Sequence, residues 1–332
     1  MKRYIIAEIA QAHDGSLGMA HSYIDALKST GVNAVKFQTH IANAESSIHE
    51  PFRIKFSKQD FTRFDYWKRM EFTENQWIEL KKHCDDVGLE FISSPFSNKA
   101  VDLLEKIGVD KYKIGSGEVN NLLMLEKIAK TKKPILLSSG MSSLNEIDQA
   151  INLINRFGNE ISILQCTTAY PTKPKEWGLN VILELKQKYD YKIGFSDHSG
   201  DIYACLAAAT LGAEIFEFHV VFDKRQFGPD TKSSITIDQA SKLVKGIDDI
   251  KKSLANKVDK NNIKRFSNLK NIFEKSLSIN KSLKKGHTIS FNDLEAKKPS
   301  NMGIPASKYI EVIGKKINKN LQKWDFLNYD DI

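Results

Sequence analysis

Residues 192–220, KIGFSDHSGDIYACLAAATLGAEIFEFHV, contain two short apolar runs joined by a segment with helical spacing. The runs at 192–197 and 214–220 are rich in isoleucine and phenylalanine, which favour buried strands. Two such runs with a helical segment between them predict a βαβ unit, in which the strands are parallel. Polar residues stand at the end of each run, although a charge inside a buried strand is costly unless it is paired or functional.

This unit recurs through most of the chain, because eight apolar runs are each followed by apolar residues at helical spacing. Residues 73–76 form a capping box, and Gly88 and Gly108 stand where helices should end. Eight such units over about 255 residues predict an α/β fold, a (β/α)8 TIM barrel. A doubly wound sheet is the alternative, but no G-x-G-x-x-G motif follows the first run. The expected strands are 4–10, 34–40, 90–96, 111–117, 134–140, 161–167, 192–197 and 214–220.

The composition changes after the expected barrel, which covers residues 1–255. Residues 256–275 are polar and rich in lysine and asparagine, which indicates a linker. Residues 276–332 contain short apolar runs and a turn at Lys285-Gly286, which predict a small β-rich domain. A segment of under ~60 residues is near the lower limit for an independent core, so we expect it to lean on a partner surface.

Length and composition exclude several classes of protein. The 332 residues are 41% apolar, but no stretch approaches the ~20 apolar residues of a membrane span, and the chain opens on a strand pattern rather than a leader. The scattered Cys84, Cys166 and Cys205 form no disulfide framework, so we expect a cytoplasmic protein with Cys166 in its core. The net charge of +8 comes from residues 257–332, with 16 basic and 8 acidic side chains. Arginines are few and no basic stretch is interleaved with aromatic residues, so no nucleic-acid binding is expected.

Polar residues gather at the C-terminal ends of the expected strands, where barrel enzymes carry their active sites. Lys36 and Lys113 are compact cations that suit phosphate and carboxylate groups. Ser116, Ser138 and Ser196 come from separate strand ends and, with backbone N–H groups beside glycines, could complete a phosphate cradle. Two lysines, three carboxylates and two histidines on one face argue against a purely structural role.

His198 and His219 lie on adjacent expected strands and could bind one divalent ion. Two histidines with water in the other positions suit a catalytic metal better than a structural one, with Glu217 nearby and Asp197 available to orient an imidazole. The alternative for each histidine alone is a hydrogen-bonded position at the rim. The other histidines outside the strand ends are expected at the surface or the rim: His13, His21, His49, His83 and His287.

A long connection separates His40 from Thr73. It contains the aromatic and basic stretch EPFRIKFSKQDFTRFDYWKRMEF at 50–72. Long loops at the catalytic face of a barrel usually shape the substrate pocket. The alternative is a lid that packs only against the rim or a neighbouring subunit.

Ten motifs occur in a specific order and spacing: IIAEI, HDGSLGMA, AVKFQTH, FISSPFS, YKIGSGE, LLSSGM, QCTTAYPT, GFSDHSG, FEFHV and FGPD. In these motifs the chain resembles the sialic acid synthase family, which makes N-acetylneuraminate and related nine-carbon (nonulosonic) acids. Residues 276–332 are similar to the SAF (antifreeze-like) domain that follows the barrel in that family, with an LKKG turn and IGKKINKNL.

The resemblance implies a reaction. Members of the family condense phosphoenolpyruvate with an open-chain N-acylated amino sugar, such as N-acetylmannosamine or a diacetamido-trideoxyhexose. Water enters, and phosphate leaves by C–O cleavage. They need a divalent ion, often Mn²⁺ with Mg²⁺ or Co²⁺ as alternatives, which polarises the aldehyde and lowers the pKa of a bound water. The resemblance also implies a domain-swapped homodimer.

The functional residues of the family match positions in this chain. By this resemblance the phosphoenolpyruvate-binding residues are Lys36, Lys113, Ser116, Ser138 and Ser196. The implied metal ligands are His198 and His219, and the implied sugar-binding residues are Gln38, Ser94, Glu118, Tyr170, Asp230 and, from the partner's SAF domain, Lys298. The implied catalytic residues are Glu8, Asp230 and His219, and either Glu8 or Asp230 could manage the proton of the attacking water.

The chain departs from the family pattern on the sugar side. Lys297-Lys298-Pro299 replaces a Lys-Arg-Pro motif, and lysine lacks the planar fork of arginine. Phe218 and Thr168 stand where arginine and asparagine are frequent. The reaction type is therefore better defined than the sugar.

Two alternatives to an unphosphorylated sugar substrate remain open. A 6-phosphorylated amino sugar is favoured by basic residues of the long connection, which are Arg53, Lys55, Arg63, Lys68 and Arg69. A non-catalytic sugar-binding homologue is the other alternative, because a fold does not guarantee a function. The intact set of lysines, histidines and carboxylates argues against it.

Overall fold

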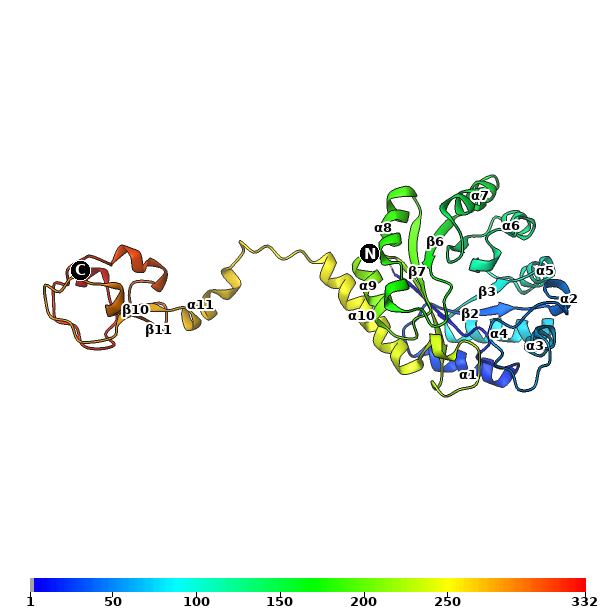
Figure 1. Ribbon diagram of the computed structural model, residues 1–332, viewed down its shortest axis with the longest axis horizontal. Coiled ribbons are helices and arrows are strands. Elements are labelled where there is room, and N and C mark those ends of the chain that lie inside the picture. Colours follow the sequence, from blue (N-terminus) through cyan, green and yellow to red (C-terminus); the bar gives the residue numbers. More distant parts are fainter. Residues whose placement is uncertain (1–2) are drawn as a thin grey trace. The chain divides into compact units, whose positions relative to one another are not determined.

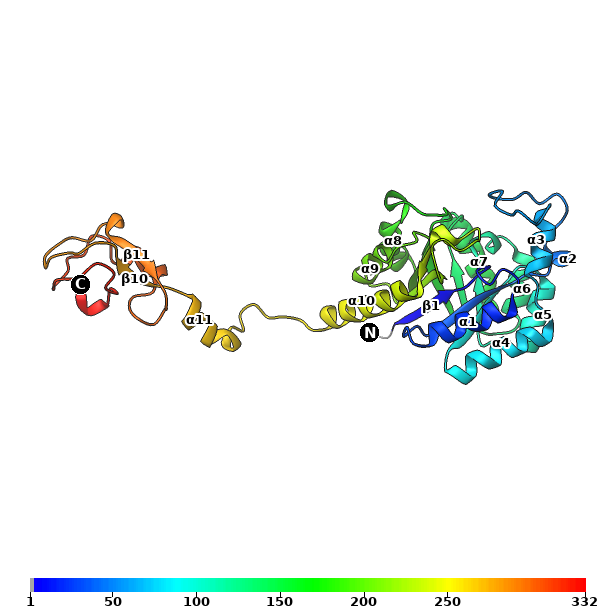
Figure 2. The ribbon, with the colours of Figure 1, turned by 90° about the horizontal axis from the view of Figure 1, so that it is seen from below.

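The computed structural model describes residues 3–332 and divides into two compact units, Met1–Asn256 and Lys257–Ile332. In the first unit, helices lie outside a set of parallel strands (Figures 1 and 2). The strands are β1 (Tyr4–Glu8), β2 (Ala34–Thr39), β3 (Glu90–Pro95), β4 (Tyr112–Ile114), β5 (Ile135–Ser138), β6 (Ile161–Cys166), β7 (Lys192–Asp197), β8 (Ile215–Val221) and β9 (Ser234–Thr236). The helices are α1 (Leu17–Lys28), α2 (Ala42–Glu45), α3 (Arg63–Met70), α4 (Glu74–Val87), α5 (Asn98–Ile107), α6 (Leu122–Ala129), α7 (Leu144–Asn155), α8 (Leu179–Lys188), α9 (Tyr203–Thr210) and α10 (Ile237–Ala255).

Strand β1 pairs with β2 on one side and with β8 on the other, so β1 to β8 close into a barrel. The register places Glu8 beside Lys36 in β2 and beside His219 in β8. The prediction of a (β/α)8 barrel is confirmed. The doubly wound alternative is wrong, because an open sheet has no pairing between its first and last strands.

Local signals in the sequence start and end the helices. At the start of α4 the Thr73 hydroxyl accepts a hydrogen bond from the Gln76 backbone N–H, and the Gln76 side-chain oxygen accepts one from the Thr73 backbone N–H. Gly88 ends the same helix at φ 80°, a conformation that glycine adopts without steric cost. Strand β4 is shorter than predicted, because the chain turns into a 3₁₀ helix at Ser116–Glu118.

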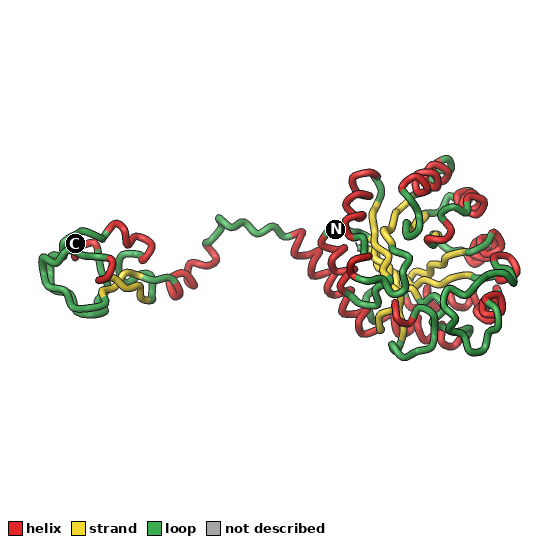
Figure 3. Tube along the Cα trace, viewed as in Figure 1, coloured by secondary structure: helices red, strands yellow, loops and turns green. Residues whose placement is uncertain are grey.

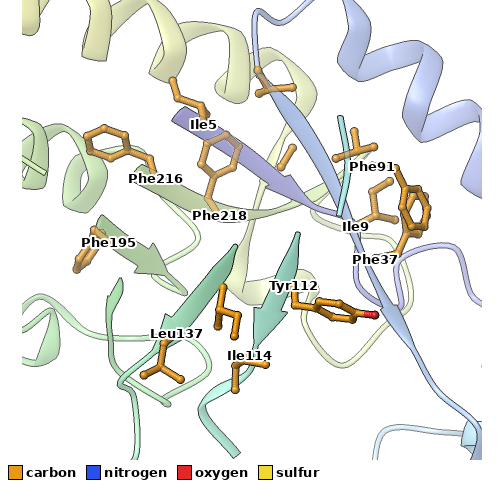
Figure 4. Close-up of a cluster of buried hydrophobic side chains, with 14 of the residues drawn as sticks. Ile5, Ile9, Phe37, Phe91, Tyr112, Ile114, Leu137, Phe195, Phe216 and Phe218 are labelled. Atoms are coloured by element: carbon orange, nitrogen blue, oxygen red, sulfur yellow. The ribbon is translucent and has the colours of Figure 1, made fainter. Parts of the chain in front are cut away.

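Two apolar layers stabilise the barrel. The outer faces of the strands pack against the helices in a core that includes Ile5, Phe37, Phe91, Phe195 and Phe216 (Figure 4). Inside the barrel, a second apolar layer consists of Ile6, Ala34, Ile92, Leu136, Leu164 and Ile215.

The second layer positions the site, because side chains two residues apart on a strand point to the same face. The residues that follow this layer by two positions therefore also point inward, and all of them line the main pocket: Glu8, Lys36, Ser94, Ser138, Cys166 and Glu217. Cys166 is buried, as expected for a core residue. It follows Leu164 by two residues, so it also lines the pocket, which was not expected.

The long connection between β2 and α4 contributes side chains to the pocket, which agrees with the expectation that it shapes the pocket. Its helices α2 and α3 share a small apolar cluster that includes Tyr66 and Trp67, and both rings line the pocket. The guanidinium of Arg69 lies 2.6 Å from Asp14, which ties the connection to the loop after β1. It also lies 2.8 Å from Asp60, which belongs to the connection itself.

The second unit has a core of its own. Strands β10 (Ser276–Ile279) and β11 (Leu294–Lys297) form an antiparallel pair, and much of the remainder is loop (Figure 3). Its buried apolar residues are Leu277, Ile279, Leu283, Ile289, Ile304, Val312, Ile317, Leu321 and Leu327. The predicted linker is not wholly irregular, because it contains α11 (Ser267–Phe273) and the Asn271 carbonyl accepts a hydrogen bond from Ser300 N–H at 3.1 Å.

Within residues 3–332, no helix combines the length and the apolar character that crossing a bilayer requires.

Candidate active site

A pocket of about 450 Å³ opens at the C-terminal ends of the barrel strands. Every site residue expected in the barrel lines it: Glu8, Lys36, Gln38, Ser94, Lys113, Ser116, Glu118, Ser138, Tyr170, Ser196, His198, His219 and Asp230. Lys298 belongs to the second unit, where its ammonium lies 5.0 Å from the centre of the Phe273 ring. The strand ends thus bring together side chains that are far apart in the sequence.

Two buried ammonium groups and two buried carboxylates occupy the base of the pocket. Lys36 forms an ion pair with Glu8, and its Nζ lies 4.0 Å from Glu217 Oε2. Lys113 Nζ lies 3.3 Å from Glu217 Oε1. Each of the four side chains is less than a tenth exposed, so their charges balance one another rather than being screened by water.

The pKa values of Glu217 and Lys36 follow from this balance of charges. Burial on its own would raise the pKa of Glu217, but the Lys113 and Lys36 ammonium groups lower it well below its usual range. Burial and the neighbouring Lys113 lower the pKa of Lys36 to about 7, and Glu217 opposes this shift. An anion that enters the pocket would stabilise the charged form of Lys36, because a nearby opposite charge favours ionisation.

The three serines surround the lysines. The ammonium of Lys113 donates to Ser138 Oγ, and Ser196 Oγ donates to Glu217 Oε1 at 2.9 Å. Ser116 Oγ accepts from the Gly140 N–H at 3.2 Å. A side chain at Gly140 would lie 2.4 Å from Ser116 Oγ, so glycine keeps this concave corner open.

The two histidines are neutral and adjacent. Their ring centroids are 5.1 Å apart, and each residue is 6% exposed. Burial lowers the pKa of both imidazoles to about 3, with His219 adding to the shift of His198 and Lys36 to that of His219. His198 Nδ1 lies 3.2 Å from the Thr167 carbonyl, so Nδ1 is the donor and Nε2 is free to accept.

This donor set fits a metal with open coordination positions. Neutral imidazole is the form of histidine that binds metals. In the part of the chain that the structure describes, no three or more histidine, cysteine, aspartate or glutamate side chains are grouped to hold an ion. His198 and His219 would therefore leave most positions to water or substrate, as catalytic sites do.

The outer half of the pocket contains the expected sugar residues. The Arg53 guanidinium lies 2.7 Å from Asp230 and stacks over the Tyr170 ring at 3.9 Å. Burial raises the pKa of Glu118, and Asn121 opposes this by donating to its carboxylate. At the inner edge, Gln38 Nε2 donates to Glu8 Oε1 at 3.3 Å, which links the sugar residues to the lysine and glutamate cluster.

Several residues in or near the pocket make contacts that the sequence did not predict. Glu217 pairs with both lysines, and the alternation of inward-facing residues along β8 could have indicated this. Gln11 and Arg53 line the pocket from loops, where no periodicity marks them. His13 is 2% exposed and packs against Phe72, so its expected position at the surface or rim is wrong.

A closed (β/α)8 barrel with charged side chains at the C-terminal ends of its strands is the arrangement found in barrel enzymes. The NeuB family model matches residues 23–259, and the chain belongs to this family. The N,N'-diacetyllegionaminic acid synthase of Campylobacter jejuni is 35% identical over 97% of this chain and 98% of its own. The pseudaminic acid synthase of Helicobacter pylori is 32% identical over 99% of this chain and 97% of its own.

A solved structure agrees with this assignment. The N-acetylneuraminic acid (sialic acid) synthetase of Leptospira borgpetersenii, crystallised with citrate, has a TM-score of 0.71 and is 29% identical. The match covers 81% of this chain and 91% of that one. The chain is therefore a member of the family of sialic-type acid synthases, with the fold of such a synthetase.

Replacing Glu217 by glutamine tests the charge balance. Glu217→Gln should lower the free energy of unfolding of the barrel by about 3–5 kcal/mol, because Lys36 and Lys113 would share only Glu8 as a counter-charge. Thermal unfolding measures the loss, and added inorganic phosphate should raise the midpoint more in the variant than in the wild type. Glu160→Gln, which breaks the exposed pair with Lys192, is the control and should change stability by under about 1 kcal/mol. Equal stability of the two variants would contradict the account.

Proposed function

We propose that this protein condenses phosphoenolpyruvate with an open-chain N-acylated amino sugar and water to give a nonulosonic acid and inorganic phosphate. The observation that carries the proposal is the convergence of two buried lysines, three serines and two neutral histidines with Glu8 in one pocket. In this reaction the C3 carbon of phosphoenolpyruvate bonds to the aldehyde carbon of the sugar. Water adds at C2, the C2–O bond breaks, and phosphate leaves. The aldehyde oxygen takes a proton and becomes a hydroxyl.

Lys36 and Lys113 are the groups proposed to bind the phosphate and carboxylate of phosphoenolpyruvate. Both ammonium groups are buried and held by carboxylates, so an entering anion finds cations already in place. Ser116, Ser138 and Ser196 are within reach of the same region and can donate to phosphate oxygens.

His198 and His219 are the proposed ligands of a divalent ion, Mn²⁺ or alternatively Mg²⁺ or Co²⁺. Such an ion, when bound, polarises a carbonyl and lowers the pKa of a coordinated water. The protein would orient His198 through its hydrogen bond to the Thr167 carbonyl. Glu8 and Asp230 both line the pocket, and either carboxylate is proposed to accept the proton of the attacking water.

An unphosphorylated sugar fits the outer pocket better than a 6-phosphorylated one. Four basic residues of the long connection already have carboxylate partners, in the pairs Arg53–Asp230, Arg63–Glu50, Lys68–Glu71 and Arg69–Asp60. The outer wall also presents Glu45, Glu50 and Glu118, which would repel a phosphate. We favour a diacetamido-trideoxyhexose, the class of sugar implied for the Campylobacter jejuni relative by its product name.

The second unit is proposed to be an SAF domain that completes the site of a partner subunit in a domain-swapped homodimer. Support comes from its separate core and from Lys298, which matches a sugar-binding position of the family. In such a dimer each site takes its barrel from one chain and Lys298 from the other.

Phosphate release from phosphoenolpyruvate tests the proposed reaction. With Mn²⁺ present, kcat/KM should be at least about tenfold higher for a diacetamido-trideoxyhexose than for N-acetylmannosamine 6-phosphate, a difference of about 1.4 kcal/mol. Preference for the phosphorylated sugar would favour the alternative substrate. Absence of phosphate release with every amino sugar would overturn the synthase proposal.

Replacing a proposed metal ligand tests the histidine pair. His219→Ala should weaken Mn²⁺ binding by at least about tenfold and lower turnover with it, because one of two protein ligands is lost. Paramagnetic resonance of free Mn²⁺ measures the binding. His21→Ala, at a partly exposed histidine that contacts His83, is the control and should leave both quantities unchanged. Unchanged Mn²⁺ affinity in His219→Ala would remove it from the ligand set.

Mixed dimers test the domain exchange. His219→Ala removes a proposed site residue from the barrel, and Lys298→Ala removes one from the second unit. Each variant alone should therefore have low activity. In a mixed domain-swapped dimer, one site combines an intact barrel with an intact Lys298, and co-expression should restore activity above the sum of the two variants. Lys297→Ala in place of Lys298→Ala is the control, and it should keep activity on its own. No recovery in mixed dimers would contradict a shared site.

A further inference from the structure

His40 follows β2 and lies between two aromatic rings at the edge of the pocket. Its ring stacks on Trp67 at 3.8 Å between centroids and on Phe96 at 4.5 Å, with interplanar angles of 17° and 15°. Trp67 belongs to α3 in the long connection, and Phe96 follows β3. His40 is 4% exposed, so its two nitrogens depend on protein partners rather than on water.

Both nitrogens of His40 have such partners. Nδ1 lies 2.7 Å from Glu45 Oε1, and Nε2 lies 2.9 Å from Gln11 Nε2 and 3.2 Å from Gln38 Oε1. A carboxylate only accepts, so Nδ1 must donate. The Gln11 amide nitrogen only donates and lies nearer to both groups than they lie to each other, so it donates to His40 Nε2 and to Gln38 Oε1, and Nε2 accepts. Glu45 and Gln11 together select the tautomer with a proton on Nδ1 and a lone pair on Nε2.

The hydrogen bonds continue from His40 through Gln11 and Gln38 to Glu8. Gln11 Nε2 has a second hydrogen, which it donates to Gln38 Oε1 at 2.6 Å. With its oxygen used in this way, Gln38 turns its Nε2 toward Glu8 Oε1 at 3.3 Å. The orientation of each amide is therefore set by the group before it, in the order Glu45, His40, Gln11, Gln38 and Glu8.

We propose that His40 is a positioning residue for the sugar half of the reaction. Its Nε2 lone pair fixes Gln11, and Gln11 fixes the Gln38 amide so that its nitrogen faces Glu8 and the sugar. Without this acceptor, Gln11 and Gln38 can both turn over, and a turned Gln38 would point its oxygen at the Glu8 carboxylate and repel it. The inference rests on the proposed function, because it assigns Gln38 and Glu8 to sugar binding and catalysis.

Two substitutions separate hydrogen bonding from stacking. His40→Gln keeps an oxygen that can accept from Gln11 but loses the ring. His40→Phe keeps a ring between Trp67 and Phe96 but has no acceptor. We expect His40→Gln to retain kcat/KM for the sugar within about threefold, and His40→Phe to lose about tenfold or more, mainly through the KM of the sugar. The affinity for phosphoenolpyruvate, measured by calorimetry, should change less than the KM of the sugar in His40→Phe, because His40 reaches Lys36 only through Gln11, Gln38 and Glu8.

A measurement without substrates keeps this proposal separate from the proposed function. Histidine ¹⁵N chemical shifts of the full-length protein report the tautomer, and the His40 signal is identified by its loss in His40→Gln. A neutral ring protonated on Nδ1 is expected, and a ring protonated on Nε2 would overturn the proposal whether or not the protein makes a nonulosonic acid.

The kinetic outcomes are equally decisive. Wild-type activity in His40→Phe, equal losses in the two variants, or a loss of phosphoenolpyruvate affinity in His40→Phe at least as large as the rise in the KM of the sugar would each show that His40 does not act through Gln11 and Gln38. A wild-type protein that turns over no amino sugar would contradict the proposed function instead, and the tautomer would then decide the proposal on His40.

Discussion

Four charged side chains that neutralise one another inside the barrel are the interaction on which the site depends. Lys36 and Lys113 could not remain buried as cations without Glu8 and Glu217, since an isolated buried charge is strongly destabilising. The closed barrel makes this arrangement possible, because alternation along the strands places Glu8, Lys36 and Glu217 just above an apolar layer, and Lys113 of β4 reaches Glu217. The cluster is also a preorganised receptor, because its cations are held in place before an anion arrives.

The long connection after β2 gives the pocket its outer wall. Arg69 holds it to the loop after β1, Arg53 reaches Asp230 and Tyr170, and the His40 ring lies against Trp67. These contacts pair the charges of Arg53 and Arg69 with carboxylates. The wall would therefore suit a neutral sugar, recognised through hydrogen bonds and apolar contact, and the anionic substrate is proposed to bind at the base of the barrel.

Much of the fold and of the site could be predicted from the sequence, because both depend on short-range patterns. Apolar runs and helix caps such as Thr73 with Gln76 defined the βα units, and polar strand ends such as Lys36 and His219 marked the pocket. What escaped prediction depends on contacts between distant segments. The ion pair that occupies Arg53 joins residues 177 positions apart, and no local pattern foretells it. Cys166 was predicted to be buried, but its place in the pocket lining escaped prediction because its apolar neighbours hid the alternation that turns it inward.

The central claim is that one pocket holds phosphoenolpyruvate on the two lysines and a divalent ion on the two histidines. A crystal structure of the protein with Mn²⁺ and phosphoenolpyruvate, with data collected at the manganese absorption edge, tests it most directly. The account predicts an anomalous peak in contact with His198 and His219, and phosphoenolpyruvate against Lys36 and Lys113. Manganese bound elsewhere, or phosphoenolpyruvate outside this pocket, would contradict it.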